Sequence, residues 1–316
     1  FIATLLTHLF GGSAGREGAA LQLGGSIGNS LGKLFHFDEK DQHIMIMCGM
    51  SAAFSALFGT PLAAAVFSME VVSVGIMHYS ALVPCVIASL TAHGIASACG
   101  IAPEIFPIAS IPAFTAKNAL IIGIFAVLCA LVSILFCTTL HNAERLYKRF
   151  FKNPYVRALA GGFIVIGLTM LVGNQTYNGT GMNIITGCME GKTVFPLAFL
   201  LKMVFTAATL GAGYKGGEIV PTLFIGSTFG TFFASAFGCS IPLCAAVGMG
   251  AVFCGVTNSP ITSLMICFEL FGFDGMPYFL IAIALSYMLS GYYGLYSSQK
   301  IIYSKYKTEY INRKTH

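Results

Sequence analysis

Charged residues are scarce in this sequence. Only 9% of its 316 residues are Asp, Glu, Lys or Arg, whereas 56% are hydrophobic and the mean hydropathy is +0.80. So few charges cannot cover a soluble globule with polar surface, which excludes a soluble fold and places the chain in a lipid bilayer. Backbone groups in hydrocarbon must hydrogen-bond within the protein, and long apolar runs without strict alternation favour helices over a barrel.

The sequence also lacks the spacings typical of redox and metal sites. Its ten cysteines include no C-x-x-C pair and its seven histidines no H-x-x-x-H pair, and no H-E-x-x-H motif occurs. Scattered cysteines of this kind act as small core residues, so we expect no cofactor and no metal. We expect no enzymatic activity. The alternatives from other classes are a structural scaffold, or a membrane-embedded enzyme that uses Glu17, Glu218 or His8 as acid and base.

Long apolar segments fill most of the chain, and several exceed the roughly 20 residues that cross a bilayer. The longest contain Gly59 and Pro61, or Gly255 and Pro260, which favours pairs of short or broken helices over single rods. We therefore predict an all-α polytopic membrane protein with short, tilted and broken helices. Its apolar segments are 15–35, 43–75, 79–100, 117–140, 157–173, 196–211, 217–238, 242–270 and 277–296.

One stretch of the sequence recurs about 200 residues later. The segments Gly49 to Glu70 and Gly248 to Glu269 share six identical residues, each displaced by 199 positions. This register indicates an internal duplication, which in a membrane protein is typical of a transporter, and we expect the two terminal glutamates to be structural. The identical pairs are Gly49 and Gly248, Met50 and Met249, Ala52 and Ala251, Phe54 and Phe253, Pro61 and Pro260, and Glu70 and Glu269.

A glycine-rich loop carries the first candidate site. Residues 11–18 read G-G-S-A-G-R-E-G and precede an apolar run that we predict to be helical. Free N–H groups and partial positive charge at a helix N-terminus attract anions, and glycines allow close approach. Glu17 could therefore occupy an anion site when ionised and leave it when protonated, which couples anion movement to protons. The alternative is an ordinary capping ion pair between Arg16 and Glu17, although an intramembrane acid favours function.

A second loop of the same kind lies in the other copy. Residues 211–218 read G-A-G-Y-K-G-G-E and precede an apolar helix with Pro221 in its first turn, and an offset of 201 places Glu17 on Glu218. Duplicated halves with interrupted helices commonly direct their helix ends at one mid-membrane site. We therefore predict that both carboxylates face a single pathway. The alternative is that Glu218 pairs with Lys215 for structural reasons.

Basic residues gather in two places, both cytoplasmic by the positive-inside rule. Nucleic-acid binding is the rival interpretation, but both clusters adjoin membrane spans. The chain also begins in apolar sequence at Phe1 without an initiator Met, which indicates that further residues precede it. We predict one transmembrane domain with a first repeat over 1–140 that is incomplete at its N-terminus, a basic inter-repeat loop over 141–157, a second repeat over 158–299 and a basic cytoplasmic tail over 300–316.

These motifs resemble the CLC family of chloride channels and proton-coupled anion antiporters over nearly the whole chain. Residues 15–18 resemble the family's G-[RK]-E-G-P motif, with Ala19 in place of the proline. Residues 49–70 resemble its G-M-A-A-x-F … P-L-A-G-x-x-F-x-x-E stretch, and residues 211–221 resemble its G-x-G-x-x-G-G-x-[FI]-x-P loop. Residues 294–297 are similar to its late tyrosine segment. The resemblance implies an inverted-repeat CLC-type architecture and a homodimer in a multi-pass cell membrane location, the bacterial inner or plasma membrane.

The resemblance also implies roles for individual residues. Glu17 matches the gating glutamate and Tyr296 the central tyrosine, whose hydroxyl coordinates the anion. The family's serine loop would lie before Phe1. The anion-binding residues that the resemblance implies are Gly15, Arg16, Gly18, Ile219, Val220 and Tyr296, with the backbone amides near Gly18, Ile219 and Val220 as the anion-facing helix ends.

Three departures from the family pattern bear on the transported ion. Val71 stands where chloride antiporters usually carry a second acidic residue for proton transfer, and Glu218 stands where a small or apolar residue is common. Together these resemble the bacterial fluoride-transporting branch, in which a glutamate of this loop accompanies the gating glutamate. Val220 replaces the hydroxyl-bearing residue frequent in that branch, so selectivity by that side chain is in question.

The sequence therefore predicts a secondary transporter that exchanges fluoride for protons and expels fluoride down the inward proton gradient. Fluoride is small and strongly hydrated, so close, strong donors must replace its water. A protonated carboxyl of Glu17 or Glu218, neutralised by burial and by the other acid, is such a donor and also carries the proton. The alternative is a CLC chloride/proton antiporter or chloride channel, with chloride as the anion.

Overall fold

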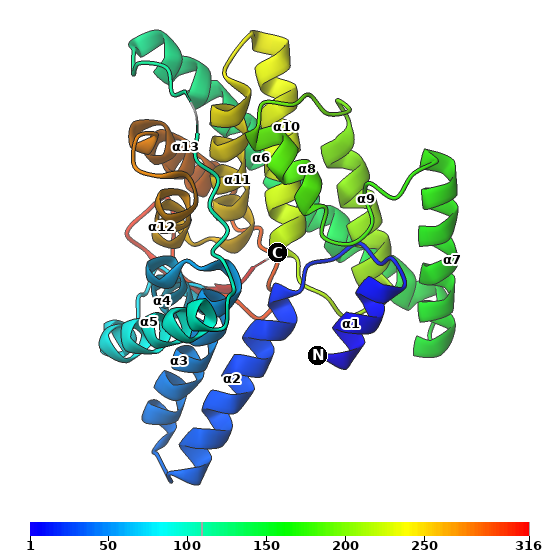
Figure 1. The fold of residues 1–316 in the computed structure, drawn as a ribbon. Coiled ribbons are helices and arrows are strands. Elements are labelled where there is room, and N and C mark those ends of the chain that lie inside the picture. Colours follow the sequence, from blue (N-terminus) through cyan, green and yellow to red (C-terminus); the bar gives the residue numbers. More distant parts are fainter. Residues whose placement is uncertain (109, 316) are drawn as a thin grey trace.

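The computed structural model describes residues 1–108 and 110–315, which form a helical body with one small sheet (Figure 1). Four of its helical segments are long and apolar enough to cross a membrane, namely Tyr79–Ala98, Ala116–Phe150, Pro154–Val172 and Ile219–Phe237. Five shorter apolar helices occur beside them within the described residues, as expected for an all-α polytopic protein. The elements are α1 (Ile2–Leu9), α2 (Glu17–Leu34), α3 (Glu39–Phe58), α4 (Pro61–Glu70), β1 (Ser73–Val74), the 3-10 helix η1 (Tyr79–Ala81), α5 (Leu82–Ala98), α6 (Ala116–Phe150), α7 (Pro154–Val172), α8 (Met182–Met189), α9 (Ala198–Gly211), α10 (Ile219–Phe237), α11 (Ile241–Thr257), α12 (Pro260–Phe271), α13 (Met276–Leu289), β2 (Lys300–Tyr303) and β3 (Tyr310–Lys314).

The predicted broken helices are present at the same place in both copies. The break between α3 and α4 lies at Gly59, whose φ of 72° is left-handed, and α4 then starts with a proline. The break between α11 and α12 lies at Asn258, with φ of 59°, and Pro260 opens α12. Proline suits the first helical turn, and Asn tolerates the left-handed conformation better than most residues. The expected interruption at Gly255 is wrong, because Gly255 lies inside α11, where a side chain would overlap Ser133 of α6.

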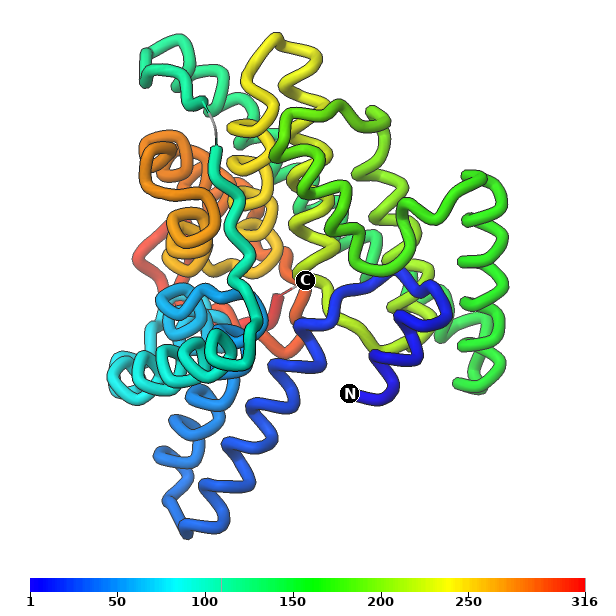
Figure 2. The backbone as a smooth tube through the Cα atoms, viewed as in Figure 1, coloured from blue at the N-terminus to red at the C-terminus, as the bar shows by residue number. Residues whose placement is uncertain are grey.

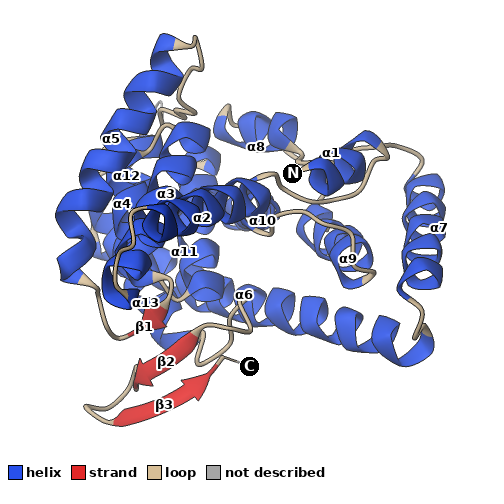
Figure 3. Cartoon of the chain, turned by 90° about the horizontal axis from the view of Figure 1, so that it is seen from below, coloured by secondary structure: helices blue, strands red, loops and turns tan. Residues whose placement is uncertain are grey.

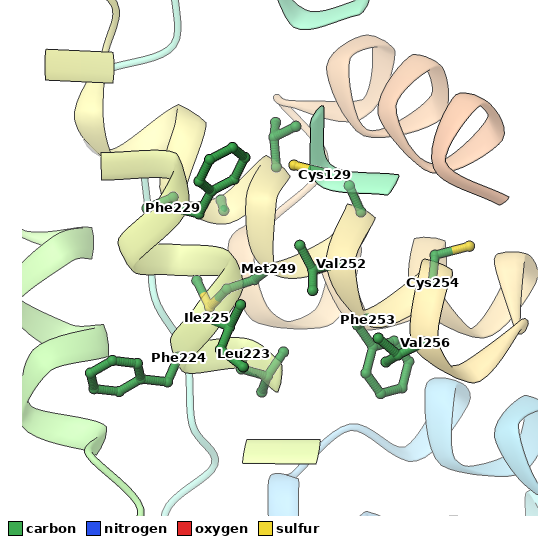
Figure 4. Packing of buried hydrophobic residues seen from close by; sticks show 14 of the residues in the cluster. Cys129, Leu223, Phe224, Ile225, Phe229, Met249, Val252, Phe253, Cys254 and Val256 are labelled. Carbon is green, nitrogen blue, oxygen red and sulfur yellow. The ribbon is translucent and has the colours of Figure 1, made fainter. Parts of the chain in front are cut away.

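Glycines bring the helices of each copy into close contact. A side chain at Gly24 of α2 would overlap the backbone of Gly49 in α3, and a side chain at Gly226 of α10 would overlap the backbone of Gly248 in α11. Small residues at such crossings let membrane helices approach closely. Figure 4 shows the resulting core between α10 and α11, where apolar side chains fill the remaining space. The pairs α2–α3 and α10–α11 thus hold the starts of α2 and α10 in fixed positions.

Two glutamates connect the copies reciprocally. Glu70, at the end of α4, accepts hydrogen bonds from the N–H groups of Ile261 (3.1 Å) and Thr262 (2.8 Å) at the start of α12, and from the Thr262 hydroxyl (2.6 Å). Glu269 accepts bonds from Leu62 and Ala63 at the start of α4, both at 2.9 Å. Glu70 therefore caps the start of α12, and Glu269, near the end of α12, caps the start of α4. Such an exchange is expected of two halves related by a two-fold axis.

We expect Glu70→Ala to destabilise the protein more than Glu269→Ala. Loss of Glu70 leaves three donors without their acceptor at a site only 8% exposed, and each buried donor left unpaired costs roughly 1–3 kcal/mol. Glu269 serves two donors in a more exposed position. The temperature at which detergent-solubilised protein loses its monodisperse chromatographic peak measures the effect. Exposed Glu309→Ala is the control, and equal loss in all three variants would contradict the capping role.

The predicted basic loop over 141–157 is wrong. Helix α6 continues to Phe150 and α7 begins at Pro154, so only residues 151–153 connect them. The basic side chains Lys148 and Arg149 lie in the last turn of α6, where positive charge offsets the helix dipole, and Lys148 pairs with Glu144 one turn earlier. The positive charge that suggested a loop stabilises a helix end instead.

The tail over 300–316 is not an unstructured extension within the residues described. Strands β2 and β3 form an antiparallel hairpin, and β2 also pairs in parallel with β1, which follows α4 (Figure 3). Ile301 is fully buried beneath the hairpin, and Tyr303 packs against Tyr310 across the strands with ring centroids 5.8 Å apart. Both strands contain isoleucine and tyrosine, Ile301 to Tyr303 in β2 and Tyr310 with Ile311 in β3, and such residues favour strands. Net charge alone does not reveal this preference.

Residues 101–108, which follow α5, are extended and cross the front of the molecule (Figure 2). The Glu104 N–H donates to the Phe58 carbonyl at the end of α3 (3.3 Å), and the Phe106 N–H donates to the Leu270 carbonyl of α12 (2.8 Å). These bonds attach the segment to both copies, and they place the Glu104 carboxylate close to the beginning of α2.

Candidate functional site

The two glycine-rich loops meet in the structure. Gly15 and Gly217 exchange backbone hydrogen bonds, each N–H donating to the other's carbonyl at 2.7 Å. A side chain at Gly15 or at Gly217 would overlap the Glu17 carboxylate, so the two glycines leave room for the carboxylate where it lies. This pairing brings the start of α2 and the start of α10 together, as the sequence predicts.

The Glu17 side chain reaches from the first copy to the helix start of the second. It is fully buried, and its Oε1 accepts a hydrogen bond from the Val220 N–H at 3.0 Å. Val220 belongs to the first turn of α10, whose N–H groups have no partners within the helix. The carboxylate thus occupies the place where a helix N-terminus attracts an anion.

Only one oxygen of this carboxylate is satisfied. Glu17 Oε2 is buried and has no hydrogen-bond partner among the residues that the structure describes. A buried polar atom without a partner raises the free energy of the conformation that contains it. The observed position of the Glu17 carboxylate is therefore only partly stabilised by hydrogen bonds.

A cavity of about 830 Å³ adjoins the carboxylate. Glu17, Glu218 and Tyr296 all line it, so the two acids and the tyrosine share one space although they come from distant parts of the sequence. The other predicted residues on its wall are Gly18 and Ile219.

The alternative pairings considered from the sequence are not found. Arg16 turns outward and its guanidinium lies 3.9 Å from the Glu104 carboxylate, not beside Glu17. No ion pair joins Glu218 to Lys215 in the part of the chain that the structure describes. Adjacent residues at a helix start point in different directions, which separates Arg16 from its neighbour. Arg16 is consequently absent from the cavity wall, contrary to its expected place among the anion ligands.

Sequence reasoning missed Lys202 of α9. Its side chain is fully buried, its ammonium donates to the carbonyls of Tyr177 (3.2 Å) and Gly179 (2.7 Å), and it lies 5.1 Å from the centre of the Phe224 ring. The charge also interacts with Glu17. A single lysine within the apolar segment 196–211 was the available signal, because an intramembrane charge marks a functional position by default.

The third residue of the enzyme alternative, His8, lies elsewhere. It lines a separate cavity of about 570 Å³ with Gln175 and Asn178, away from both glutamates. No group of His, Cys, Asp or Glu side chains suited to a metal occurs within 1–108 and 110–315, and the ten cysteines there form no disulfide. The three proposed acid–base residues are therefore not brought together.

Comparison with known proteins identifies the family. The family model described as "Voltage gated chloride channel" matches residues 1–291. A chloride/fluoride channel protein of Pseudomonas syringae pv. tomato is 34% identical over 311 residues, covering 96% of this chain and 69% of that protein. An H(+)/Cl(-) exchange transporter of Vibrio cholerae serotype O1 is 26% identical over 272 residues, covering 81% of this chain and 58% of that protein.

The fold is similar to that of a solved transporter. The crystal structure of a CLC-type fluoride/proton antiporter superposes with a TM-score of 0.91 at 36% sequence identity, covering 94% of this chain and 75% of that chain. This similarity confirms the predicted all-α, CLC-type architecture. The family consists of membrane channels and transporters, which also confirms that the chain is not an enzyme. This multi-pass membrane chain belongs to the voltage gated chloride channel family, the CLC family.

Proposed function

We propose that this protein is a fluoride/proton antiporter in which Glu17 competes with the anion for the start of α10. The observation that carries the proposal is the hydrogen bond from the Val220 N–H to Glu17 Oε1, at 3.0 Å. An anion that binds the same N–H must displace the carboxylate. Protonation removes the negative charge of Glu17 and weakens its hold on the helix start. Anion entry and proton uptake are therefore linked at a single position.

Glu218 supplies the second acid of the pathway. It lines the cavity with Glu17, and like charges in one site oppose simultaneous ionisation. One of the two carboxyls then carries a proton and can donate it in a hydrogen bond to fluoride. A small anion that loses its water needs such donors close by. Tyr296, which also lines the cavity, adds a hydroxyl.

Lys202 has a supporting role in this mechanism. Its ammonium is held by two neutral carbonyls and interacts with Glu17, so its charge acts on the anion site from a fixed position. A buried cation beside the site lowers the free energy of an anion that has left water.

Two lines of support favour fluoride over chloride. One is the residue pattern, with Glu218 in the cavity and the apolar Val71 on its wall in place of an acid. The other is the resemblance to relatives described as a chloride/fluoride channel protein and as a CLC-type fluoride/proton antiporter. The second candidate is a chloride/proton antiporter, favoured by the more distant relative described as an H(+)/Cl(-) exchange transporter.

The proposal also covers the repeats, the oligomeric state and the orientation in the membrane. Residues 1–140 and 158–299 act as the two repeats, with Gly15, Gly18, Ile219 and Val220 forming the helix-end site between them. Two molecules of the protein form a homodimer in a bacterial cell membrane, and each subunit has its own pathway. The basic end of α6 and the C-terminal hairpin face the cytoplasm.

Flux from proteoliposomes tests the proposal. Purified protein is reconstituted with fluoride or chloride inside, and anion release and proton uptake are recorded together with an ion-selective electrode and a pH electrode. We expect fluoride release accompanied by proton uptake, and much slower chloride release. Chloride release as fast as fluoride release and without proton counterflow would disprove the fluoride assignment, and proton-coupled chloride release would favour the second candidate.

A further inference from the structure

The C-terminal hairpin inserts a lysine between the second copy's helices. Lys305, in the turn between β2 and β3, donates from its ammonium to the Asn258 side-chain oxygen, to the Tyr287 carbonyl (3.0 Å) and to the Ser290 hydroxyl (3.1 Å). Its charge also lies 4.4 Å from the centre of the Tyr287 ring. All these acceptors are neutral, and no salt bridge of Lys305 is found in the described parts of the chain.

Asn258 transmits this contact. It occupies the break between α11 and α12, where the first copy has Gly59, and both residues are left-handed. The asparagine therefore keeps the backbone of the glycine and adds a side chain. Its amide nitrogen donates to the Tyr293 carbonyl (2.9 Å) and to the Gln299 side-chain oxygen (3.0 Å).

Gln299 completes the chain of hydrogen bonds. Its amide nitrogen donates to the carbonyls of Val71, after α4, and Thr257, at the end of α11, both at 2.8 Å. Because an ammonium can only donate, Lys305 fixes the oxygen of Asn258 toward itself, which fixes the nitrogen toward Gln299. The side-chain amides of Asn258 and Gln299 are therefore oriented consistently along a chain of hydrogen bonds that runs from Lys305 in the hairpin to Val71 in the first copy.

The hairpin holds the tyrosine segment at a second point. The Thr315 hydroxyl donates to the Tyr296 carbonyl (2.8 Å), and the Thr315 N–H donates to the Gln299 carbonyl (3.2 Å). Tyr296, Ser298 and Gln299 line the same cavity as Glu17 and Glu218. Residues 294–299 are therefore attached to the hairpin through the backbone and through the Lys305 network.

We infer that Lys305 is a positioning residue of the transport pathway, which acts through Asn258 and Gln299 to hold Tyr296 at the cavity. The inference rests on the proposed function for the role of Tyr296 as an anion ligand. Without the ammonium, the oxygen of Asn258 loses its donor and the segment 294–299 gains freedom. The Tyr296 hydroxyl then spends less time in position to bind the anion. The affinity for the anion should fall more than the maximal transport rate.

Four variants of the full chain test this inference. Lys305→Met removes the charge and keeps the length of the side chain, and Lys305→Arg retains a donor. Asn258→Gly removes the side chain at a position where the first copy tolerates glycine, so the backbone conformation is preserved. Lys307→Met removes an exposed lysine of the same hairpin and is the matched control.

Two measurements separate positioning from stability and from the proposed function. Hydrogen exchange of the backbone amides over 292–299 reports the freedom of the segment, whichever ion is transported. The fluoride concentration at half-maximal flux reports binding, and we expect it to rise about tenfold in Lys305→Met and in Asn258→Gly, with a maximal rate that changes by less than about threefold. Lys305→Arg is expected to recover most of the affinity, and Lys307→Met to match the parent protein.

The outcomes are distinct. Faster exchange over 292–299 together with weaker fluoride binding in both network variants supports the inference. Unchanged exchange, or faster exchange with unchanged half-maximal fluoride concentration, overturns it. Should Lys305→Met fail to fold, Asn258→Gly decides alone. If the parent protein shows no fluoride/proton exchange, the proposed function fails, and hydrogen exchange still decides whether Lys305 orders the segment.

Discussion

Replacing Glu17 with glutamine is expected to abolish proton counterflow. Glutamine keeps the shape of the side chain and its oxygen can still accept the Val220 N–H bond, but it cannot bind and release a proton. Proton uptake by proteoliposomes should fall by at least about a hundredfold, on the scale of losing one proton-transfer group. Any anion flux that remains should be uncoupled from the pH gradient.

The control for Glu17→Gln is Glu104→Gln. Glu104 lies near the same helix start, but its carboxylate faces Arg16 and does not line the cavity. Its replacement should leave the ratio of protons to anions unchanged. Full proton transport in Glu17→Gln would remove Glu17 from the role of gate, whatever its effect on the rate of anion flux.

Replacing Glu218 should separate anion preference from proton transfer. Alanine at this position removes a donor from the cavity, and a hydrogen bond to a charged group contributes roughly 1.5–3 kcal/mol. The preference for fluoride over chloride should therefore fall about tenfold to a hundredfold in Glu218→Ala. Glutamine retains an N–H donor, so Glu218→Gln should keep most of the preference while it loses any proton that Glu218 carries.

Anion competition in reconstituted vesicles distinguishes the two variants of Glu218. The initial fluoride flux is measured at increasing chloride concentration, together with proton uptake. Glu190→Gln is a suitable control, because Glu190 pairs with Lys192 at 2.6 Å and is absent from the cavity wall. Equal preference in Glu218→Ala and Glu218→Gln would show that hydrogen-bond donation from this position does not select the anion.

The helix breaks and the meeting of the loops were predictable because local chemistry determines them. Gly59 with Pro61 specifies a left-handed residue followed by a new helix. In the second copy Pro260 was predicted to mark the break, but Asn258 and not the expected Gly255 is the left-handed residue. The offset between the copies placed Glu17 and Glu218 in equivalent loops, and the structure brings both to one cavity. Because the two halves are duplicates, residues in equivalent positions of the sequence could be expected to lie in equivalent positions of the fold. Composition alone gives no such expectation.

Other features depend on contacts that sequence order does not reveal. Arg16 was expected at the anion site, but its partner Glu104 lies on a segment whose path across the molecule is set by bonds to Phe58 and Leu270. Lys305 was predicted to belong to a basic tail. Its acceptors lie at the ends of α11 and α13, and nothing in the sequence near Lys305 points to them. In each case the deciding partner is far away in the chain and belongs to no shared motif.

The reciprocal bonds of Glu70 and Glu269 constrain how the protein can be made. Ala63 is synthesised 206 residues before Glu269, so the first turn of α4 must wait for its acceptor until the ribosome has translated nearly the whole second half. Glu70 likewise waits 192 residues for Thr262. During that interval unpaired polar groups are costly in lipid. Neither half can therefore complete the hydrogen bonds of its own helix start until the other half has been made.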